Sequence, residues 1–317
     1  MNRSYFSRFR SELELVSVVL MWGVNFPLIK IILAVMPPHV LNTFRVTSAG
    51  LVLGYIQLRR SNWSLKTFWA PLRADPKAFI LLSFVGWILY QVAFITGLSM
   101  TGAGNAAIIM ASAPIWTALL ARLMGVDRLS KISWIGLLVS ISGTATVVVL
   151  GNAEVSLSAD LLLGNAVVLS AAVFWGSYTA MTRPMVEKHT PLSLTVISLL
   201  LALPFLFAFS TPFWKLIDWS QVTFWYWVAI FFSGSLSTGI AVVFWNNSVR
   251  KLGASHTAAF GNLVPLVALF SSYFMLGNEI VPAQLIGGTL IIGGLVLMRW
   301  ARRRIQKIEP IEGASIL

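Results

Sequence analysis

Largely apolar runs of about twenty residues recur along the whole chain. As a helix, a run of this length crosses the roughly 30 Å hydrocarbon core of a bilayer. Backbone groups inside lipid must be satisfied within the protein, which favours helices for every run. We therefore predict an all-α integral membrane protein with ten transmembrane helices, at 13–35, 40–58, 78–99, 103–124, 132–150, 161–182, 192–210, 222–248, 254–276 and 282–300.

Composition agrees with a lipid-facing surface. Of 317 residues, 57% are hydrophobic and 11% are charged, whereas soluble domains have about 25% charged residues. In a soluble protein the net charge of +12 would suggest a nucleic-acid partner. Membrane topology explains it here, and we expect no nucleic-acid partner. The chain contains no cysteine, which excludes disulfides, iron–sulfur clusters and thiolate metal sites.

Lysine and arginine are divided unevenly between the predicted loops. With the N-terminus in the cytoplasm, 20 of the 23 fall on cytoplasmic segments and only Lys215 on an outer loop. The remaining two, Lys30 and Arg45, lie within spans. The positive-inside rule thus predicts that both termini are cytoplasmic. We expect a multi-pass protein of the cell's inner (plasma) membrane.

The two halves of the chain, 1–150 and 151–317, repeat one another. Matching positions, at offsets of 153 and then 151, are Trp22–Gly23 with Trp175–Gly176, Lys30 with Arg183, Pro38 with Pro191, Gly102–Ala103 with Gly253–Ala254, Pro114 with Pro265, Gly136 with Gly287, and Gly143 with Gly294. Each half carries five predicted spans, and an odd number places the second copy upside down in the membrane. Such inverted repeats are typical of secondary transporters, with the substrate site between the copies near the midplane. The second half also ends in a basic cytoplasmic tail.

Short motifs follow one another in order along nearly the whole chain. They are Trp22–Gly23–x–Asn25–Phe26, Lys30, Pro37–Pro38, Arg45, Phe244–Trp245–Asn246, Arg250–Lys251–Leu252–Gly253–Ala254, Pro265, Leu276–Gly277–Asn278–Glu279 and Gln284–Leu285–Ile286–Gly287–Gly288. Because it carries these motifs in this order, the chain resembles the ten-helix EamA-type exporters of the drug/metabolite transporter superfamily. The resemblance implies five-plus-five inverted repeats, cytoplasmic termini and export of metabolites such as amino acids. The chain departs from the family pattern at Gly125–Val126–Asp127–Arg128.

Lys30 and Arg45 are candidate functional residues because a charge near the bilayer centre costs about 2.5–3.5 kcal/mol. No Asp or Glu lies in the core of a span. Two uncompensated cations suit a substrate carboxylate or phosphate, which arginine can hold in a bidentate manner. The alternative is that either side chain extends to the headgroups. Arg183, the counterpart of Lys30, falls at the opposite membrane face, which favours rim or gate roles for both.

Polar and aromatic residues at three- and four-residue spacing share a face on several predicted helices. The predicted cavity residues, besides Arg45, are Trp22, Asn25, Phe26, Tyr90, Gln91, Trp175 and Tyr178, with Trp245 a weaker candidate. Amides facing lipid are costly, so Asn25 and Gln91 should point inwards. Ordinary packing for the aromatic rings, and interhelical hydrogen bonds for the amides, are the alternatives.

Proline and glycine suggest how the helices bend and pack. Pro27, Pro114 and Pro265 interrupt spans and are candidate hinges, although they could equally curve helices around a core. Small residues on two predicted helices favour close helix contacts, within a monomer or in a homodimer. They are Gly136, Ser140, Gly143, Gly287, Gly288, Gly293 and Gly294.

We predict a secondary active transporter that exports small metabolites, with amino acids the expected class, by alternating access around a midplane site. We expect no cofactor and no metal, since the three histidines lack ligand spacing. Proton-coupled efflux of cationic drugs is the alternative, disfavoured by the lack of an acid within the core of a span. An intramembrane enzyme would need a nucleophile with its base, or a metal cluster, and is also disfavoured. A channel is a further alternative.

Overall fold

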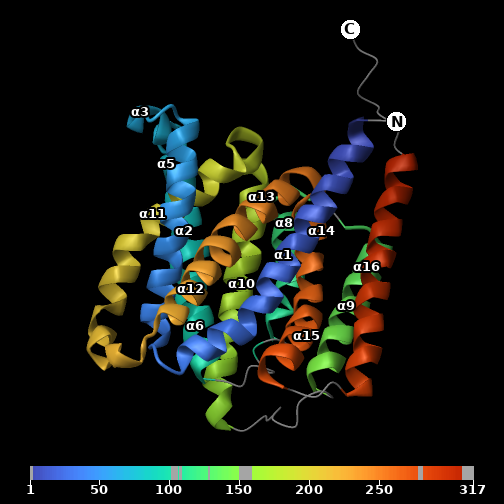
Figure 1. Ribbon diagram of the computed structural model, residues 1–317. Coiled ribbons are helices and arrows are strands. Elements are labelled where there is room, and N and C mark those ends of the chain that lie inside the picture. Colours follow the sequence, from blue (N-terminus) through green and yellow to red (C-terminus); the bar gives the residue numbers. More distant parts are fainter. Residues whose placement is uncertain are drawn as a thin grey trace.

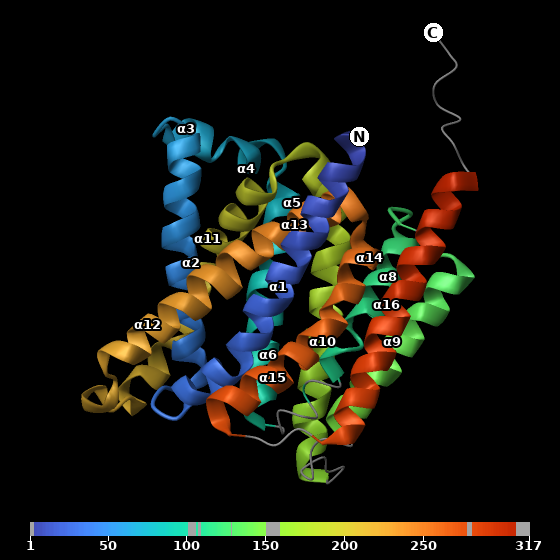
Figure 2. The same ribbon diagram turned by 45° about the vertical axis from the view of Figure 1, so that its right-hand side comes forward.

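The computed structural model describes residues 3–100, 106, 109–127, 129–149, 159–277 and 281–308, which contain helices and no strand. The helices form one bundle, with the start of α1 (Arg3–Leu33) and the last turns of α16 (Pro282–Ile308) at the same end (Figures 1 and 2). The other longer helices are α2 (Pro38–Arg60), α6 (Tyr90–Met100), α8 (Ala113–Leu123), α9 (Lys131–Val149), α10 (Ala159–Lys188), α11 (Pro191–Ser210), α12 (Phe224–Phe232), α13 (Ala241–Leu252) and α15 (Val264–Leu276).

Shorter segments extend or connect these helices. They are α3 (Leu65–Phe68), α4 (Ala70–Ala74), α5 (Pro76–Leu82), α14 (Ala254–Ala259) and the 3₁₀ segments η2 (Thr211–Leu216), η3 (Trp219–Gln221) and η5 (Phe260–Leu263). Two π-helical segments, η1 (Ser83–Leu89) and η4 (Ser233–Ile240), lie within continuous helical stretches. π-Helical turns often occur at functional sites.

Seven described helical stretches are long and apolar enough to cross a membrane. They are Glu12–Leu33, Pro76–Met100, Leu162–Lys188, Pro191–Leu216, Phe224–Leu252, Ala254–Met275 and Pro282–Ala301. α2, α8 and α9 overlap the other three predicted spans. The all-helical class with membrane-length helices is thus confirmed. The count of ten crossings and the cytoplasmic termini stay predictions, and the proposed boundary between the halves, at 150, lies outside the described residues.

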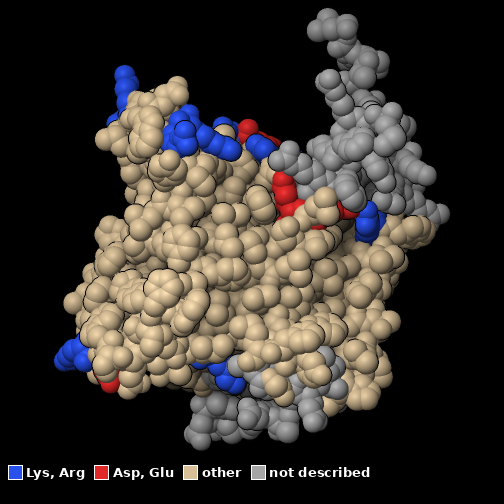
Figure 3. All heavy atoms as spheres, viewed as in Figure 1, with Lys and Arg blue, Asp and Glu red and all other residues tan. Residues whose placement is uncertain are grey.

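The outer surface is suited to lipid. On the face in Figure 3, charged side chains gather at the two ends of the bundle and a broad band without them lies between. Large apolar side chains such as Leu51, Ile80 and Ile135 are exposed on the helices. In water such a surface would be unfavourable, whereas lipid accommodates it.

Helices of the two halves interleave. α1 packs against α13 and α15, α10 packs against α6 and α8, and α2 packs against α11. At the repeat offset, α1 corresponds to α10, α13 to α6, α15 to α8 and α2 to α11. Each helix pair made by α1 therefore has an equivalent pair made by α10, and the α2–α11 pair is its own equivalent. The centre of the bundle is therefore built from both halves.

The glycines of the two Trp-Gly motifs have matching packing roles. A Cβ atom at Gly23 would overlap Val267 of α15, and one at Gly176 would lie 2.7 Å from Cβ of Trp116 of α8. Trp116 and Val267 are themselves 151 residues apart. The motif recurs because in each half its glycine allows the same close approach of two helices.

α9 and α16 pack along a seam of glycines. A Cβ at Gly136 would lie 2.7 Å from the carbonyl oxygen of Gly294, and one at Gly143 would lie 2.6 Å from that of Gly287. Rising numbers on α9 meet falling numbers on α16, so the two helices are antiparallel. The predicted close helix contact is confirmed for these four glycines, whereas a Cβ at Gly293 would meet nothing within 4 Å. A homodimer stays a prediction.

Asp75, just before α5, joins the two halves at one end of the bundle. Its Oδ2 lies 2.6 Å from His189 Nε2, and its Oδ1 lies 3.8 Å from Lys188 Nζ. The imidazole also packs on the ring of Phe79. The hydrogen bond with His189 lowers the pKa of Asp75 below its ordinary value of 3.8, and the charge of Lys188 adds to this effect.

A pH-dependent stability follows from this contact. Since the folded pKa of Asp75 is depressed, its stabilising contribution is complete above the unfolded value and is lost as the pH falls through the folded value. We expect Asp75→Asn to lower the Tm at neutral pH, and the difference from wild type to shrink as the pH falls below 3.8. Thermal unfolding in detergent over a pH series measures this. A Tm difference that is independent of pH would contradict it.

Candidate functional site

A cavity of about 160 Å³ lies at the centre of the bundle. It is lined by residues of α1, α2, η1, α6, α8, α10, η4, α13, α14, η5 and α15, hence by both halves of the chain. A cavity of roughly 150 Å³ accommodates a benzene-sized molecule. The space therefore matches a small metabolite.

The structure brings eight of the nine predicted cavity residues together around this space. They are Trp22, Asn25, Phe26, Arg45, Tyr90, Gln91, Trp175 and Trp245. Two of the predicted hinge residues, Pro114 and Pro265, also line it, whereas Pro27 lies inside α1 and outside the lining.

Tyr178 differs from the prediction, because it lies behind the cavity wall. Its ring is 1% exposed and stacks on Trp175 with centroids 5.4 Å apart. Its hydroxyl accepts a hydrogen bond from Nδ2 of Asn246 at 2.9 Å. Tyr178 supports the wall and does not form it.

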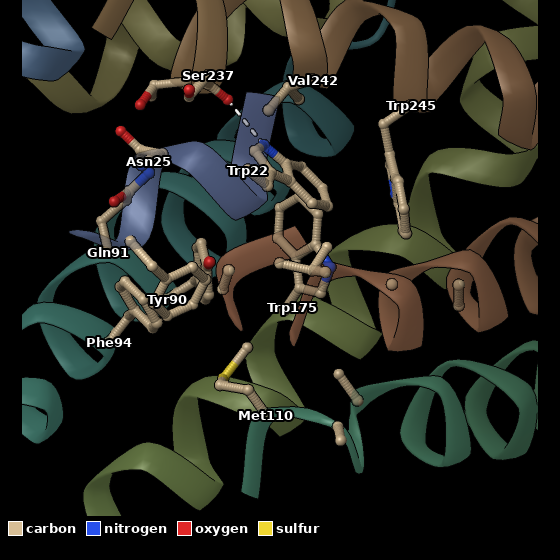
Figure 4. Close-up of a pocket in the computed structure, with 18 of the residues that line it drawn as sticks. Trp22, Asn25, Tyr90, Gln91, Phe94, Met110, Trp175, Ser237, Val242 and Trp245 are labelled. Atoms are coloured by element: carbon tan, nitrogen blue, oxygen red, sulfur yellow. Dashed lines mark hydrogen bonds between the residues drawn. The ribbon is translucent and has the colours of Figure 1, made fainter. Parts of the chain in front are cut away.

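Three tryptophans from both halves form the aromatic wall (Figure 4). The ring centroid of Trp22 lies 5.4 Å from that of Trp175 and 5.0 Å from that of Trp245. Trp22 Nε1 donates to the carbonyl oxygen of Ser237 at 2.8 Å, which fixes the indole orientation. Tyr90 continues the wall, 4.9 Å from Trp175. Such a surface can bury an apolar group or contact an ammonium group through cation–π interactions.

Arg45 is the one charged residue among the described residues that line the cavity. Its side chain is 5% exposed, which rules out the alternative in which it extends to the headgroups. Nε donates to Ser233 Oγ at 2.7 Å and Nη2 to Thr238 Oγ1 at 3.0 Å. No carboxylate of a described residue forms an ion pair with it. An unpaired buried charge is costly, so an anionic group entering the cavity would be stabilised here.

Asn25 and Gln91 lie side by side at the cavity, near Ser237 (Figure 4). Each is 7% exposed. Oδ1 of Asn25 accepts no hydrogen bond from any described residue. The alternative role as an interhelical hydrogen bond is therefore not observed for this oxygen, which is buried beside the cavity.

Lys30 and Arg183, the predicted rim residues, both lie outside the lining. Lys30 is exposed on α1. Nη1 of Arg183 donates to the carbonyl oxygens of Val249 at 3.2 Å and Arg250 at 2.6 Å. A cation at these carbonyls satisfies and stabilises the C-terminus of α13. This contact gives Arg183 a structural role, and a gating role for either residue stays a prediction.

Asn262 and the hydroxyls of η4 are not among the residues predicted from the sequence. Asn262 is fully buried, lines the cavity and leaves its Oδ1 without a donor among the described residues. Ser237 and Thr238 line it from η4. The available signal was the stretch 233–239, where four hydroxyl residues and two glycines interrupt an apolar span.

Residues 11–149 and 162–300 each match the EamA-like transporter family. The chain belongs to this family. The two matches place one EamA unit in each half and confirm the family resemblance seen in the motifs. With its membrane-length helices, this EamA-family chain is a multi-pass membrane protein.

Relatives of this EamA-family chain are named as transporters. The uncharacterized transporter YyaM of Bacillus subtilis is 30% identical over 245 residues, which cover 77% of this chain and 80% of the relative. A probable terminal-alkyne amino-acid exporter of Streptantibioticus cattleyicolor is 29% identical over 303 residues, covering 93% and 96%. A solved crystal structure at 18% identity shares the fold, with a TM-score of 0.76 over 94% of this chain and 99% of that one. These similarities point to transport rather than catalysis.

Proposed function

We propose that this protein is a secondary active carrier that exports small carboxylate-bearing metabolites, amino acids foremost, by alternating access around the central cavity. The observation that carries the proposal is the unpaired guanidinium of Arg45 in an otherwise uncharged, aromatic-lined space. One carboxylate bound there would neutralise the site.

An amino acid complements each part of the cavity. Its carboxylate suits Arg45, which can hold it with two parallel hydrogen bonds. Its ammonium group suits the free Oδ1 of Asn25 and the faces of the tryptophans. An apolar side chain suits the remaining aromatic wall. The relative named as an amino-acid exporter supports the same class.

Alternating access is supported by how the two EamA units are assembled. The antiparallel seam of α9 and α16 agrees with copies inserted upside down relative to each other. The matching crossings at Gly23 and Gly176 would let either unit rock against the other with similar contacts. The cavity between the units would then open to one side of the membrane at a time.

The competing functions lack support in the cavity. A cationic drug would meet the positive charge of Arg45 and no carboxylate among the described lining residues. The same lining holds no histidine or cysteine and no acid that could serve an enzyme as base or nucleophile.

Counterflow in liposomes tests the proposal. Vesicles containing the purified protein and loaded with an unlabelled amino acid are expected to accumulate the labelled one transiently above protein-free vesicles. A stable ion conductance in a planar bilayer would instead indicate a channel. Equal uptake with and without the protein, for a panel covering apolar, polar and charged amino acids, would contradict the substrate class.

A further inference from the structure

The π-helical segment η4 lies directly against α2 at Arg45. A Cβ atom at Gly234 would overlap both the carbonyl oxygen of Arg45 and Oγ of Ser48. Only glycine therefore permits this approach, and it places the hydroxyls of η4 beside the guanidinium. Arg45 and its partner Ser233 are 188 positions apart in the chain.

The π-helical turn is what allows two hydroxyls of η4 to reach the same guanidinium. Ser233 and Thr238 are five residues apart. In an α-helix, at about 100° per residue, they would point about 140° away from each other. A π turn pairs residue i with residue i+5, so they stack on one face. Oγ1 of Thr238 also donates to the carbonyl oxygen of Ser233 at 3.1 Å, which ties the pair together.

These two hydroxyls accept hydrogen bonds from one edge of the Arg45 guanidinium and leave its other edge without a bond to η4. They accept from Nε at 2.7 Å and from Nη2 at 3.0 Å. A guanidinium has five N–H donors in a rigid planar fork, so fixing Nε and one Nη2 hydrogen sets the plane of the group. No described residue is seen to accept from Nη1 or from the second Nη2 hydrogen. These donors therefore remain for a ligand in the cavity that Arg45 lines.

The second π-helical segment has no such cation. Ser83, at the start of η1, precedes Ser233 by 150 residues. The counterpart of Arg45 at the 153 offset is Ser198, a fully buried residue whose hydroxyl has no partner among the described residues. Among the described residues, η4 is the one π turn with an arginine hydrogen-bonded to it. An anionic group would thus bind on one side of the cavity and give the substrate a single orientation.

We infer that Ser233 and Thr238 are positioning residues, which use the π-helical geometry of η4 to hold the Arg45 guanidinium in the plane that receives a substrate carboxylate. The inference rests on the proposed function, since it concerns recognition of a carboxylate in the same cavity. Beyond the proposed function, it states that the preference for a carboxylate depends on two hydroxyls of the second half of the chain and on the π turn that carries them.

Binding of matched carboxylates and carboxamides tests the inference. Leucine and phenylalanine, each compared with its carboxamide, are titrated into the purified full-length protein. Wild type is expected to prefer the acid by about tenfold or more, since charge-assisted pairs are the stronger ones. The double variant Ser233→Ala/Thr238→Val should lose most of this preference. The substitutions Ser233→Thr and Thr238→Ser, which keep a hydroxyl, should retain it.

Ser235 provides the matched control, because it lies on the same π turn and its hydroxyl donates to Ser48 O instead. Ser235→Ala should keep the wild-type preference. If the double variant does not fold, Thr238→Val alone, which preserves side-chain volume, takes its place. If a folded variant without the hydroxyls keeps the full preference for the acid, even with a lower Tm, the positioning role is overturned and the proposed function stands. A wild type that binds acid and amide equally overturns the carboxylate assignment and the inference together.

Discussion

Arg45→Ala is expected to raise the KM for amino-acid counterflow by about 30-fold or more. Truncating one member of a buried, hydrogen-bonded charge pair typically costs at least 2 kcal/mol, and each 1.4 kcal/mol is a factor of ten. Arg45 is the one charged residue among the described residues of the lining, so no neighbour there can replace it. Counterflow over a range of substrate concentrations, with folded yield monitored in parallel, measures the effect.

Lys30 is the matched control for this experiment. It is the other cation predicted within a span, yet it is exposed and outside the lining. Lys30→Ala should leave the KM near wild type. Arg45→Lys should be intermediate, because lysine keeps the charge but not the planar fork. An Arg45→Ala variant that folds and retains its KM would show that the carboxylate binds elsewhere, whereas loss of the folded protein would indicate a structural role for Arg45.

Gly294→Ala is expected to lower the free energy of unfolding by about 1–3 kcal/mol or more, the cost of overpacking a tight contact. The added Cβ would overlap the carbonyl oxygen of Gly136 and the backbone nitrogen of Ser140. Those are backbone atoms of a long helix, so relief requires α9 and α16 to move apart. Thermal or denaturant unfolding in mixed micelles measures the loss.

The adjacent glycine is the control. A Cβ at Gly293 would meet nothing within 4 Å. Gly293→Ala should leave stability unchanged or raise it by up to about 1 kcal/mol, because alanine restricts the unfolded chain and favours the helix. Equal effects of the two substitutions would contradict the role of the α9–α16 seam.

Much of the candidate site could be predicted because helical periodicity is local. Trp22, Asn25 and Phe26 share a face on α1 whatever the rest of the protein does, and lipid excludes their polar members from the outside. The same rule failed for Tyr178. Periodicity places it on the inner side of α10, but the depth at which a side chain sits depends on its neighbours, and Asn246 and Trp175 hold it behind the wall.

The class of fold follows from local sequence, since apolar runs of membrane length leave the backbone no alternative to helices. The repeat also follows from the sequence, because Trp-Gly and its glycine crossings recur in both halves. The hydrogen-bonding environment of Arg45, by contrast, depends on the tertiary structure. Its partners, Ser233 and Thr238, lie 188 and 193 residues away and share a face only through a π turn. A one-residue change in helical register rotates every later side chain by about 100°, so such a constellation exists only once the helices have packed.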